Sequence, residues 1–411
     1  MKKILTALLL VCTPLVFFGC ATIAKDHVTA GSTTNFTDIS DALPKTGLWR
    51  ESLALYDING DGFLDIVAPP PRKPEKSQNR PFVFLYDVGE RKWTGDKYVF
   101  PEGYVYGGIA AGDINGDGLP DIALAQHAGR VTLFLNDKGN RFIESPMPIQ
   151  GEFHSRAVVL SDINGDGRTD VVALSEAKFS SGLIPRGILC AINKGDNNWD
   201  IRVLEDKSGL FGDTLSIGDV NGDGMKDIAA ALMTSTTELQ KLIWFGDGKG
   251  DFKNYTGDLF GGDSAVPMIV RTGDVDGEVG DEAVFGLALI GGGEKEKGRI
   301  SVEKWTGDGF KDISLGLNSL GYLVAFDVAD IDGDGRSELV VLTDQGIHIC
   351  KYNVKSGWRV QEHFPIPMSD ISNVTDLRAG RNRDGSVIII YNLGKYESEG
   401  LNRGIKAYIL K

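Results

Sequence analysis

One nine-residue stretch, Asp57-Ile58-Asn59-Gly60-Asp61-Gly62-Phe63-Leu64-Asp65, recurs along the chain and decides the fold. The pattern Asp-x-Asn-Gly-Asp-Gly-x-x-Asp returns from Asp113, Asp162 and Asp219. Copies with altered residues begin at Asp274 and Asp330, and a degenerate copy begins at Gly380. Successive copies start about 54 residues apart on average. Seven units of this size account for nearly the whole chain beyond residue 32, which indicates a repeat protein.

Each unit has the composition of a small β-sheet. One apolar run leads into the acidic loop and a second follows it, as Ala157–Leu160 and Val171–Leu174 do around the third copy. A third run, such as Val131–Leu135, comes after a variable loop. The fourth opens on an aromatic residue in six units: Trp93, Phe142, Trp199, Phe252, Phe310 and Trp358. Short strands at regular spacing with Gly and Asp turns predict an all-β fold. Four strands repeated seven times predict a seven-bladed β-propeller.

The two ends of the chain predict how the ring closes. The last unit stops after a third strand, Gly404–Leu410, and has no fourth. The N-terminal segment Asn35–Ser40 has the residue pattern of the fourth strand at Gly309–Ser314. We therefore expect the N-terminal strand to complete the last blade, with Phe36 as its aromatic residue.

The acidic loops have the oxygen ligands that Ca²⁺ prefers. Positions 1, 3, 5 and 9 carry Asp, Asn or Glu, position 7 offers a backbone carbonyl, and position 6 is Gly where the chain must turn sharply. Ca²⁺ accepts 6–8 such oxygens at about 2.3–2.6 Å. An EF-hand also needs a bidentate Glu at position 12, where this chain has residues such as Ala68, Leu124 and Ala173. The alternative is a solvated turn, for which Asp, Asn and Gly are also favoured, but five near-identical loops argue against it.

The units resemble the FG-GAP or VCBS-type repeats of integrin α-subunit propellers and bacterial surface proteins, over roughly Thr33–Lys411. This resemblance implies a seven-bladed propeller with Ca²⁺ held in the hairpins between the first and second strands. Carried over by position, the four regular ligand sets are Asp57, Asn59, Asp61, Phe63 and Asp65; Asp113, Asn115, Asp117, Leu119 and Asp121; Asp162, Asn164, Asp166, Arg168 and Asp170; Asp219, Asn221, Asp223, Met225 and Asp227. The other two are Asp274, Asp276, Glu278 and Glu282, and Asp330, Asp332, Asp334, Arg336 and Glu338.

The resemblance is incomplete in two loops. The fifth set departs at Val279, which stands where the other loops have Gly, so its occupancy is open. The seventh loop lacks ligands at positions 1 and 9 and is expected to be empty. We therefore expect five or six structural Ca²⁺ ions, with dissociation constants on the order of 10⁻⁴–10⁻³ M, as in extracellular modules.

The N-terminus has the features of an export signal. Lys2 and Lys3 precede an apolar run that is too short to span a bilayer comfortably. The pair Gly19-Cys20 resembles the lipobox of bacterial lipoproteins, although Phe17 and Phe18 depart from its usual residues. We expect a signal peptide at 1–19, lipidation of Cys20, a linker at 20–32 and the propeller at 33–411. Ala21 in place of Asp favours the outer membrane, on its periplasmic or cell-surface face; the alternative is cleavage at an ordinary peptidase site.

The composition of the chain argues against nucleic acid as a partner and against a disulfide-based fold. The net charge of −14 argues against binding nucleic acid, which needs Lys and Arg to neutralise phosphates. The chain has 4 Cys, which excludes a disulfide scaffold, and Cys190 and Cys350 are expected to be buried, unpaired thiols. The 53 Gly fit the turns of the repeated units.

A possible binding surface is indicated by large side chains that recur ahead of the acidic loops. They are Trp49, Tyr106, His154, Phe211 and Tyr322. In an integrin-like propeller, such positions enter the innermost strand near the axial mouth, where aromatics can stack on a sugar or enclose a cation. The alternative is packing between blades, which is the more usual role of large aromatics.

The leading functional prediction is a non-enzymatic binding or scaffolding module for a protein or surface glycan at the cell envelope. The five His residues are scattered and no nucleophile motif accompanies them. A polysaccharide-active, lyase-like enzyme is the alternative, because some propellers with related repeats are lyases and fold alone does not determine activity.

Overall fold

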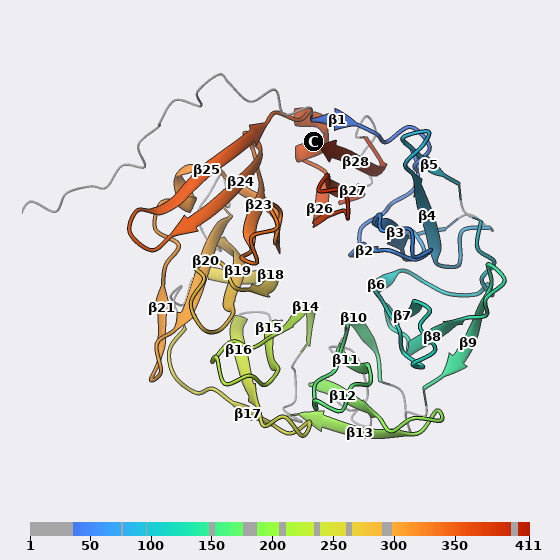
Figure 1. The fold of residues 1–411 in the computed structure, drawn as a ribbon, viewed down its shortest axis with the longest axis horizontal. Helices are drawn as coiled ribbons and strands as arrows, with labels where there is room; N and C mark the ends of the chain where they lie inside the picture. Colours follow the sequence, from blue (N-terminus) through green and yellow to red (C-terminus); the bar gives the residue numbers. More distant parts are fainter. Residues whose placement is uncertain are drawn as a thin grey trace, which may run out of the picture.

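The fold is a closed ring of seven four-stranded antiparallel sheets (Figure 1). The computed structural model describes residues 36–74, 77–95, 97–147, 153–175, 187–204, 211–233, 239–259, 265–289, 298–395 and 402–411. The predicted signal peptide, the linker and Cys20 lie outside these residues. The predicted all-β seven-bladed propeller is confirmed.

The first three blades follow the order of the sequence. Blade 1 comprises β2 (Ala54–Tyr56), β3 (Asp65–Ala68), β4 (Phe82–Asp87) and β5 (Lys92–Thr94). Blade 2 comprises β6 (Gly107–Gly112), β7 (Asp121–Gln126), β8 (Val131–Asn136) and β9 (Phe142–Pro146). Blade 3 comprises β10 (Ser155–Ser161), β11 (Asp170–Ser175), β12 (Ile188–Asn193) and β13 (Trp199–Leu204).

The next three blades repeat this order. Blade 4 comprises β14 (Phe211–Gly218), β15 (Asp227–Met233), β16 (Leu239–Gly246) and β17 (Phe252–Asn254). Blade 5 comprises β18 (Ala265–Gly273), β19 (Glu282–Leu289), β20 (Arg299–Trp305) and β21 (Phe310–Asp312), followed by the 3₁₀ turn η1 (Leu317–Ser319). Blade 6 comprises β22 (Leu323–Ala329), β23 (Glu338–Thr343), β24 (Gly346–Asn353) and β25 (Gly357–Phe364).

Blade 7 is built from both ends of the chain, as predicted. The short helix α1 (Met368–Ile371) leads into β26 (Val374–Arg381), β27 (Val387–Leu393) and β28 (Gly404–Leu410), and β1 (Thr37–Asp38) is the fourth strand. Thr37 pairs with Ile409. The Phe36 ring stacks on Phe364 and Tyr408 at centroid distances of 4.1 and 4.6 Å, so it joins blade 7 to the outer strand of blade 6. This pairing covers the edge of β28 at Ile409 and Tyr408, so that the two-residue strand β1 becomes the short outer edge of blade 7.

The core lies in the second and third strands of the blades. β3, β7, β11, β12 and β23 are buried at every residue. Alternate residues of each strand face opposite neighbours, so Val172 packs towards blade 4 while Val171 packs towards blade 2. Cys190 and Cys350 are buried free thiols, as predicted. Among the described residues, no helix is long and apolar enough to cross a membrane.

Candidate metal centres in the blade hairpins

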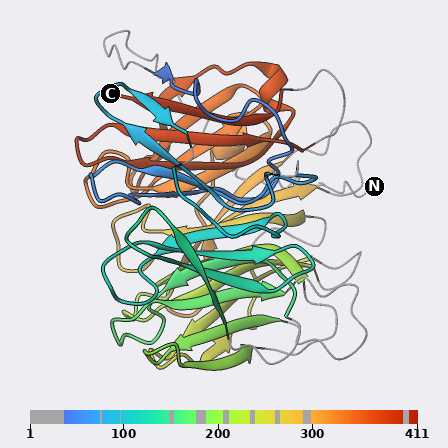
Figure 2. The ribbon, with the colours of Figure 1, turned by 90° about the vertical axis from the view of Figure 1, so that its right-hand side faces the viewer.

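Each acidic loop connects the first and second strands of its blade. The first strand lies closest to the ring axis in every blade (Figure 1). Because the blades share one strand order and direction, all seven hairpins lie on the same face of the ring, which Figure 2 shows edge-on. The connections between second and third strands, and between successive blades, therefore lie on the opposite face.

The first loop is ordered by hydrogen bonds from its own backbone to its carboxylates. Gly60 and Gly62 each donate a backbone N–H to the Asp57 carboxylate at 2.8 Å. Phe63 donates to Asp61 at 2.9 Å. These bonds fix the carboxylates of positions 1 and 5 against the backbone of the loop.

The carboxylate at position 9 is different, because it is fully buried and ties the hairpin to the third strand. Asp65 accepts one bond from the backbone N–H of Ile58 and another from Tyr86, both at 2.9 Å. The same two bonds recur in the next three blades, with lengths of 2.8–3.0 Å, to Asp121, Asp170 and Asp227. All four carboxylates are 0% exposed.

Burial makes ionisation of these groups costly. It raises the pKa of Asp65 to about 7 and the pKa values of Asp121, Asp170 and Asp227 to about 6 each, although backbone N–H donors oppose the shift. Neighbouring loop carboxylates add to the rise, for example Asp117 beside Asp121. A buried carboxylate surrounded by others needs a positive partner to remain charged at neutral pH.

The predicted sharp turn at position 6 occurs with the predicted residue. Gly62 and Gly167 have φ values of +89° and +82°, a conformation that disfavours any side chain. Loop 5 has the exposed Val279 at this position, and the positive φ of +105° falls one residue later, on Gly280. The departure noted in the sequence is therefore a one-residue shift of the turn.

The donor types of loops 1–4 fit a hard divalent cation. Each loop contains three carboxylates, one Asn side chain and the carbonyl of residue 7, which are the oxygen types that Ca²⁺ binds. Among Lys and Arg of the described ranges, none forms an ion pair with the carboxylates of loops 1, 2 or 4. In loop 3 only Arg168 does so, by contacting Asp166.

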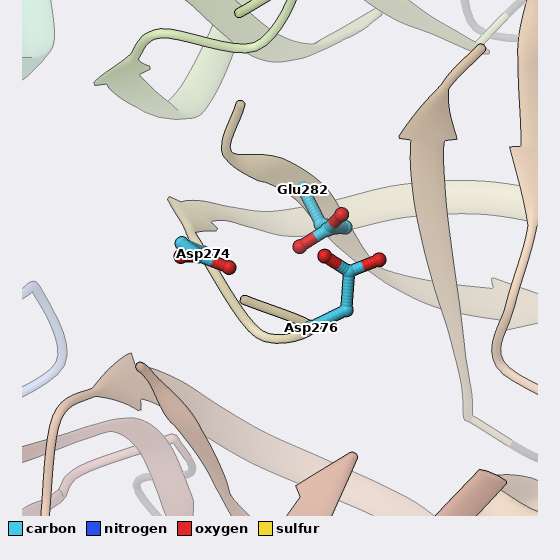
Figure 3. Close-up of side chains that lie close together, drawn as sticks. All are labelled: Asp274, Asp276 and Glu282. Atoms are coloured by element: carbon cyan, nitrogen blue, oxygen red, sulfur yellow. The ribbon is translucent and has the colours of Figure 1, made fainter. Parts of the chain in front are cut away.

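Loops 5 and 6 bring their acidic residues together most closely. One carboxylate oxygen each from Asp274, Asp276 and Glu282 lie within 4.8 Å of one another, and Figure 3 shows the three side chains converging. The same holds for Asp330, Asp332 and Glu338. These clusters could hold a metal ion, but each is also in contact with a Lys side chain from the third strand of its blade. Lys304 contacts Asp276 of loop 5, and Lys351 contacts Asp332 of loop 6. The remaining predicted ligand Glu278 is bonded to Lys304 at 2.6 Å.

The degenerate seventh loop is closed by a different set of bonds. Asn382 donates to the Ser386 hydroxyl at 2.9 Å, and Arg381 donates to the backbone carbonyl of Ile331 in loop 6 at 3.0 Å. Arg383 donates its backbone N–H to the carbonyl of Gly62 in loop 1 at 2.9 Å. This loop therefore reaches its neighbours with basic residues where the others present acids.

Adjacent loops are also bonded to each other. Asp281 of loop 5 donates its N–H to the Asp219 carbonyl of loop 4 at 2.7 Å. Ser337 of loop 6 donates to the Asp274 carbonyl of loop 5 at 2.6 Å. Any group that orders one loop therefore also orders the contact between two blades.

The ring axis contains a cavity of about 820 Å³. All seven innermost strands line it, and its charged residues are Arg50, Glu51, Arg156, Arg271, Asp327, Asp376, Arg378 and Lys395. Arg271 of blade 5 bonds Asp327 of blade 6 at 3.0 Å and Asp376 of blade 7 at 2.9 Å. Sequence reasoning missed this network; its signal is a single charged residue in each of the largely apolar strands β18 and β22, opposite the more polar β26.

Two of the five side chains predicted near the axial mouth pack against neighbouring rings. Trp49 is 2% exposed, meets Phe82 edge-on, and donates its indole N–H to the Thr46 carbonyl at 2.8 Å. Tyr106 stacks on His127 at 4.7 Å. The lining of the axial cavity does not include Trp49, Tyr106, His154 or Tyr322. Phe211 begins β14, and its side chain lies outside the described part of the structure.

Comparison with known proteins agrees with this geometry. Residues 113–173, which contain loops 2 and 3, match the FG-GAP-like repeat family. The resemblance to FG-GAP repeats is confirmed. Integrin alpha-IIb of Mus musculus is 27% identical over 218 residues, which cover 48% of this chain and 21% of the integrin. Integrin alpha-4 of Xenopus laevis is 23% identical over 248 residues, covering 54% of this chain and 23% of the integrin.

These matches concern the propeller alone. The chain matches less than a quarter of the length of either integrin. A crystal structure of BBS1N in complex with ARL6DN, soaked with mercury, has a TM-score of 0.57 at 12% identity, covering 91% of this chain and 96% of that one. This chain and BBS1N therefore share a fold.

Proposed function

We propose that this FG-GAP propeller is a Ca²⁺-stabilised, non-enzymatic binding or scaffolding module for a protein or surface glycan at the cell envelope. The observation that carries the proposal is the ring itself. Seven blades leave one face occupied by acidic hairpins and enclose an axial cavity lined by every blade. The similarity to integrin α chains supports a binding role, and is the reason for preferring it to catalysis.

In loops 1–4 the residues that would hold Ca²⁺ are the side chains at positions 1, 3, 5 and 9 with the carbonyl at position 7. Bound Ca²⁺ would supply the positive charge that the buried position-9 carboxylate lacks. The chain's own contribution is to pre-form the donor set, because backbone N–H groups already hold Asp57, Asp61 and Asp65 in place. The role is structural, since each loop also contacts a neighbouring blade.

Removal of Ca²⁺ tests this part of the proposal. Metal-stripped protein should melt at a lower temperature than protein in millimolar Ca²⁺. With dissociation constants of about 10⁻⁴–10⁻³ M, each filled loop should add roughly 1 kcal/mol to the free energy of unfolding. Mg²⁺ at the same ionic strength is the control, because its strict octahedral geometry suits this set poorly. An unchanged melting temperature would remove calcium from the proposal.

The axial cavity is the proposed contact for the partner. Its lining has five basic and three acidic residues, in a protein whose net charge is −14. Arg50 precedes the inner strand β2 and Arg156 is the second residue of β10, so both lie at the end away from the acidic hairpins. Arg156 bonds the His127 ring at 2.9 Å. An excess of positive charge in this recess favours a partner with a carboxylate or other anionic group.

A capture experiment tests the contact. Immobilised protein in millimolar Ca²⁺ is exposed to envelope extract and, separately, to purified acidic and neutral polysaccharides. The double variant Arg50→Gln, Arg156→Gln should lose retention at least tenfold. The control variant Arg359→Gln, which removes an exposed guanidinium from the outer strand β25, should bind as the wild type does. Equal binding by both variants places the contact elsewhere, and depolymerisation of a polysaccharide would establish the enzyme alternative.

We also propose that Cys20 carries a lipid that anchors the protein in the outer membrane. The support is the signal-like segment that ends at Gly19-Cys20. Cys20→Ala should move the protein from the membrane fraction to the soluble fraction, without loss of folding. Protease treatment of intact cells then distinguishes the cell-surface face from the periplasmic face.

A further inference from the structure

Two lysines occupy the acidic loops of blades 5 and 6. The Lys351 ammonium lies 2.8 Å from both Asp334 Oδ2 and Glu338 Oε1, and also contacts Asp332. The Lys304 ammonium lies 2.6 Å from Glu278 Oε2 and also contacts Asp276. Both side chains are largely buried, at 13% and 20% exposure. The Lys351 ammonium donates hydrogen bonds to the carboxylates of positions 3 and 5 and forms an ion pair with the carboxylate of position 9.

Strand register explains why the lysines reach these loops. Lys351 pairs across the sheet with the position-9 residue Glu338, because the next pair along is Leu339 with Cys350. Lys304 pairs with Glu282 in the same way. The corresponding residues in blades 1–4 are all apolar: Leu85, Leu135, Ile192 and Phe245.

Two further residues differ together with the lysine. Position 3 is Asn in loops 1–4 but Asp276 and Asp332 in loops 5 and 6. Position 9 is Asp in loops 1–4 but Glu282 and Glu338 in loops 5 and 6. An Asn side chain would present N–H donors as well as its oxygen to the ammonium, whereas Asp presents acceptors only. All three differences therefore suit an ammonium as the occupant of the loop.

We propose that Lys304 and Lys351 are built-in counter-ions that replace Ca²⁺ in loops 5 and 6. This inference rests on the proposed calcium-binding role of loops 1–4 and reduces the expected number of ions from five or six to four. Ca²⁺ needs 6–8 oxygens at about 2.3–2.6 Å. In loop 6 the ammonium already takes the carboxylates of positions 3, 5 and 9, so the two cations compete for one place. The acidic loops of blades 5 and 6 thereby keep their hairpin conformation without dissolved metal.

Equilibrium dialysis of metal-stripped protein against Ca²⁺, read by elemental analysis, tests the number of ions. The wild type should bind four. Blade 6 carrying Asp332→Asn, Glu338→Asp and Lys351→Ile copies the residues of blade 3, and should bind a fifth. The reverse exchange in blade 3, Asn164→Asp, Asp170→Glu and Ile192→Lys, should reduce the number to three. Six ions in the wild type, or exchanges that leave the number unchanged, would overturn the proposal.

A second measurement does not depend on calcium binding. In chelator, Lys351→Met leaves Asp332 and the buried Glu338 without their counter-ion and leaves Asp334 with Arg336 alone, so the melting temperature should fall by several degrees. Lys253→Met, on the exposed face of β17, is the control and should melt as the wild type does. If neither the wild type nor any exchange variant binds Ca²⁺, the proposed calcium role of loops 1–4 is wrong. The melting temperature of Lys351→Met then decides the counter-ion role by itself. An unchanged melting temperature would then overturn it.

Discussion

Blades 3 and 6 form a natural matched pair. Both have Arg at position 7 of the acidic loop, and both Arg168 and Arg336 pair with the Asp at position 5. Both bury a carboxylate at position 9 that accepts the N–H of position 2, at 3.0 Å in blade 3 and 2.8 Å in blade 6. The third strand, however, places Ile192 beside the loop in blade 3 and Lys351 in blade 6.

Under the calcium proposal for loops 1–4, the pair would have one hairpin geometry held by two kinds of positive charge. A dissolved ion stabilises the blade only when its concentration is sufficient. A lysine on the neighbouring strand is always present, because it is part of the chain. In a ring with both kinds of loop, calcium would stabilise blades 1–4, whereas the stability of blades 5 and 6 would not depend on calcium.

The largest expected effect comes from truncating position 9 in either blade. Asp170→Ala leaves the buried N–H groups of Ile163 and Asn193 without acceptors, at a cost of about 2–5 kcal/mol. Glu338→Ala should cost at least as much, because it also removes a partner of Lys351. Chemical denaturation in chelator and in Ca²⁺ measures both.

The two variants should differ in their response to calcium. Asp170→Ala removes one ion site, so the stabilisation gained from Ca²⁺ should shrink by about one quarter. Glu338→Ala should gain as much from Ca²⁺ as the wild type does. Asp308→Ala, in an exposed turn of blade 5, controls for loss of a carboxylate. Equal shrinkage in both variants would mean that the two loops bind calcium alike.

A second difference between the blades predicts an intermediate effect of pH. Where blade 3 has the buried Leu189, blade 6 has His348, whose Nε2 lies 3.1 Å from the Thr343 hydroxyl and whose ring stacks on His363 at 4.5 Å. Burial, followed by repulsion from His363, lowers the pKa of His348 to about 4, and Asp344 opposes this shift. The folded state therefore favours the neutral ring.

Stability that depends on this neutral ring is present above about pH 6.5, the usual pKa of histidine, and is lost as the pH falls towards 4. The loss should be on the order of 2 kcal/mol. In His348→Leu, which copies blade 3, this component should be absent. The difference in the free energy of unfolding between the wild type and His348→Leu, measured from pH 7 to pH 4, isolates the contribution of His348. The loop carboxylates titrate in both proteins and therefore cancel in this difference. Parallel curves would show that His348 is not the acid-sensitive group.

Most of the ring could be predicted because its determinants are local. The nine-residue loop specifies a hairpin, and Phe36 identifies the N-terminal segment as a fourth strand by its similarity to Phe310. The lysines could not be found in this way. Lys351 follows Glu338 by 13 residues, but Lys304 follows Glu282 by 22, because the connection between second and third strands differs in length. Only the strand register shows that both face position 9.

The axial network and the aromatic residues show a different limit. Arg271 and Asp376 come from blades 5 and 7, more than 100 residues apart in sequence, and meet only because the ring closes around them. The recurrence of large side chains ahead of the loops was visible in the sequence. It could not tell which way Trp49 points, because this residue precedes β2 and strand alternation does not set its direction. Here it packs on Phe82.

The smallest expected effect concerns the arginines that the two blades share. Arg168 and Arg336 are 43% and 34% exposed, so their pairs with Asp166 and Asp334 should each contribute less than about 1 kcal/mol, and less still at high salt. Removing each arginine should nevertheless have a different effect on calcium binding in blade 3 than in blade 6. In Arg168→Ala, Asp166 loses a competing cation, so a Ca²⁺ titration of loop 3 should shift to lower concentration. In Arg336→Ala, Lys351 remains bonded to Asp334 at 2.8 Å, and the titration should match that of the wild type. A shift in both variants would indicate that loop 6 also binds calcium, because only an ion-binding loop gains affinity when a neighbouring guanidinium is removed.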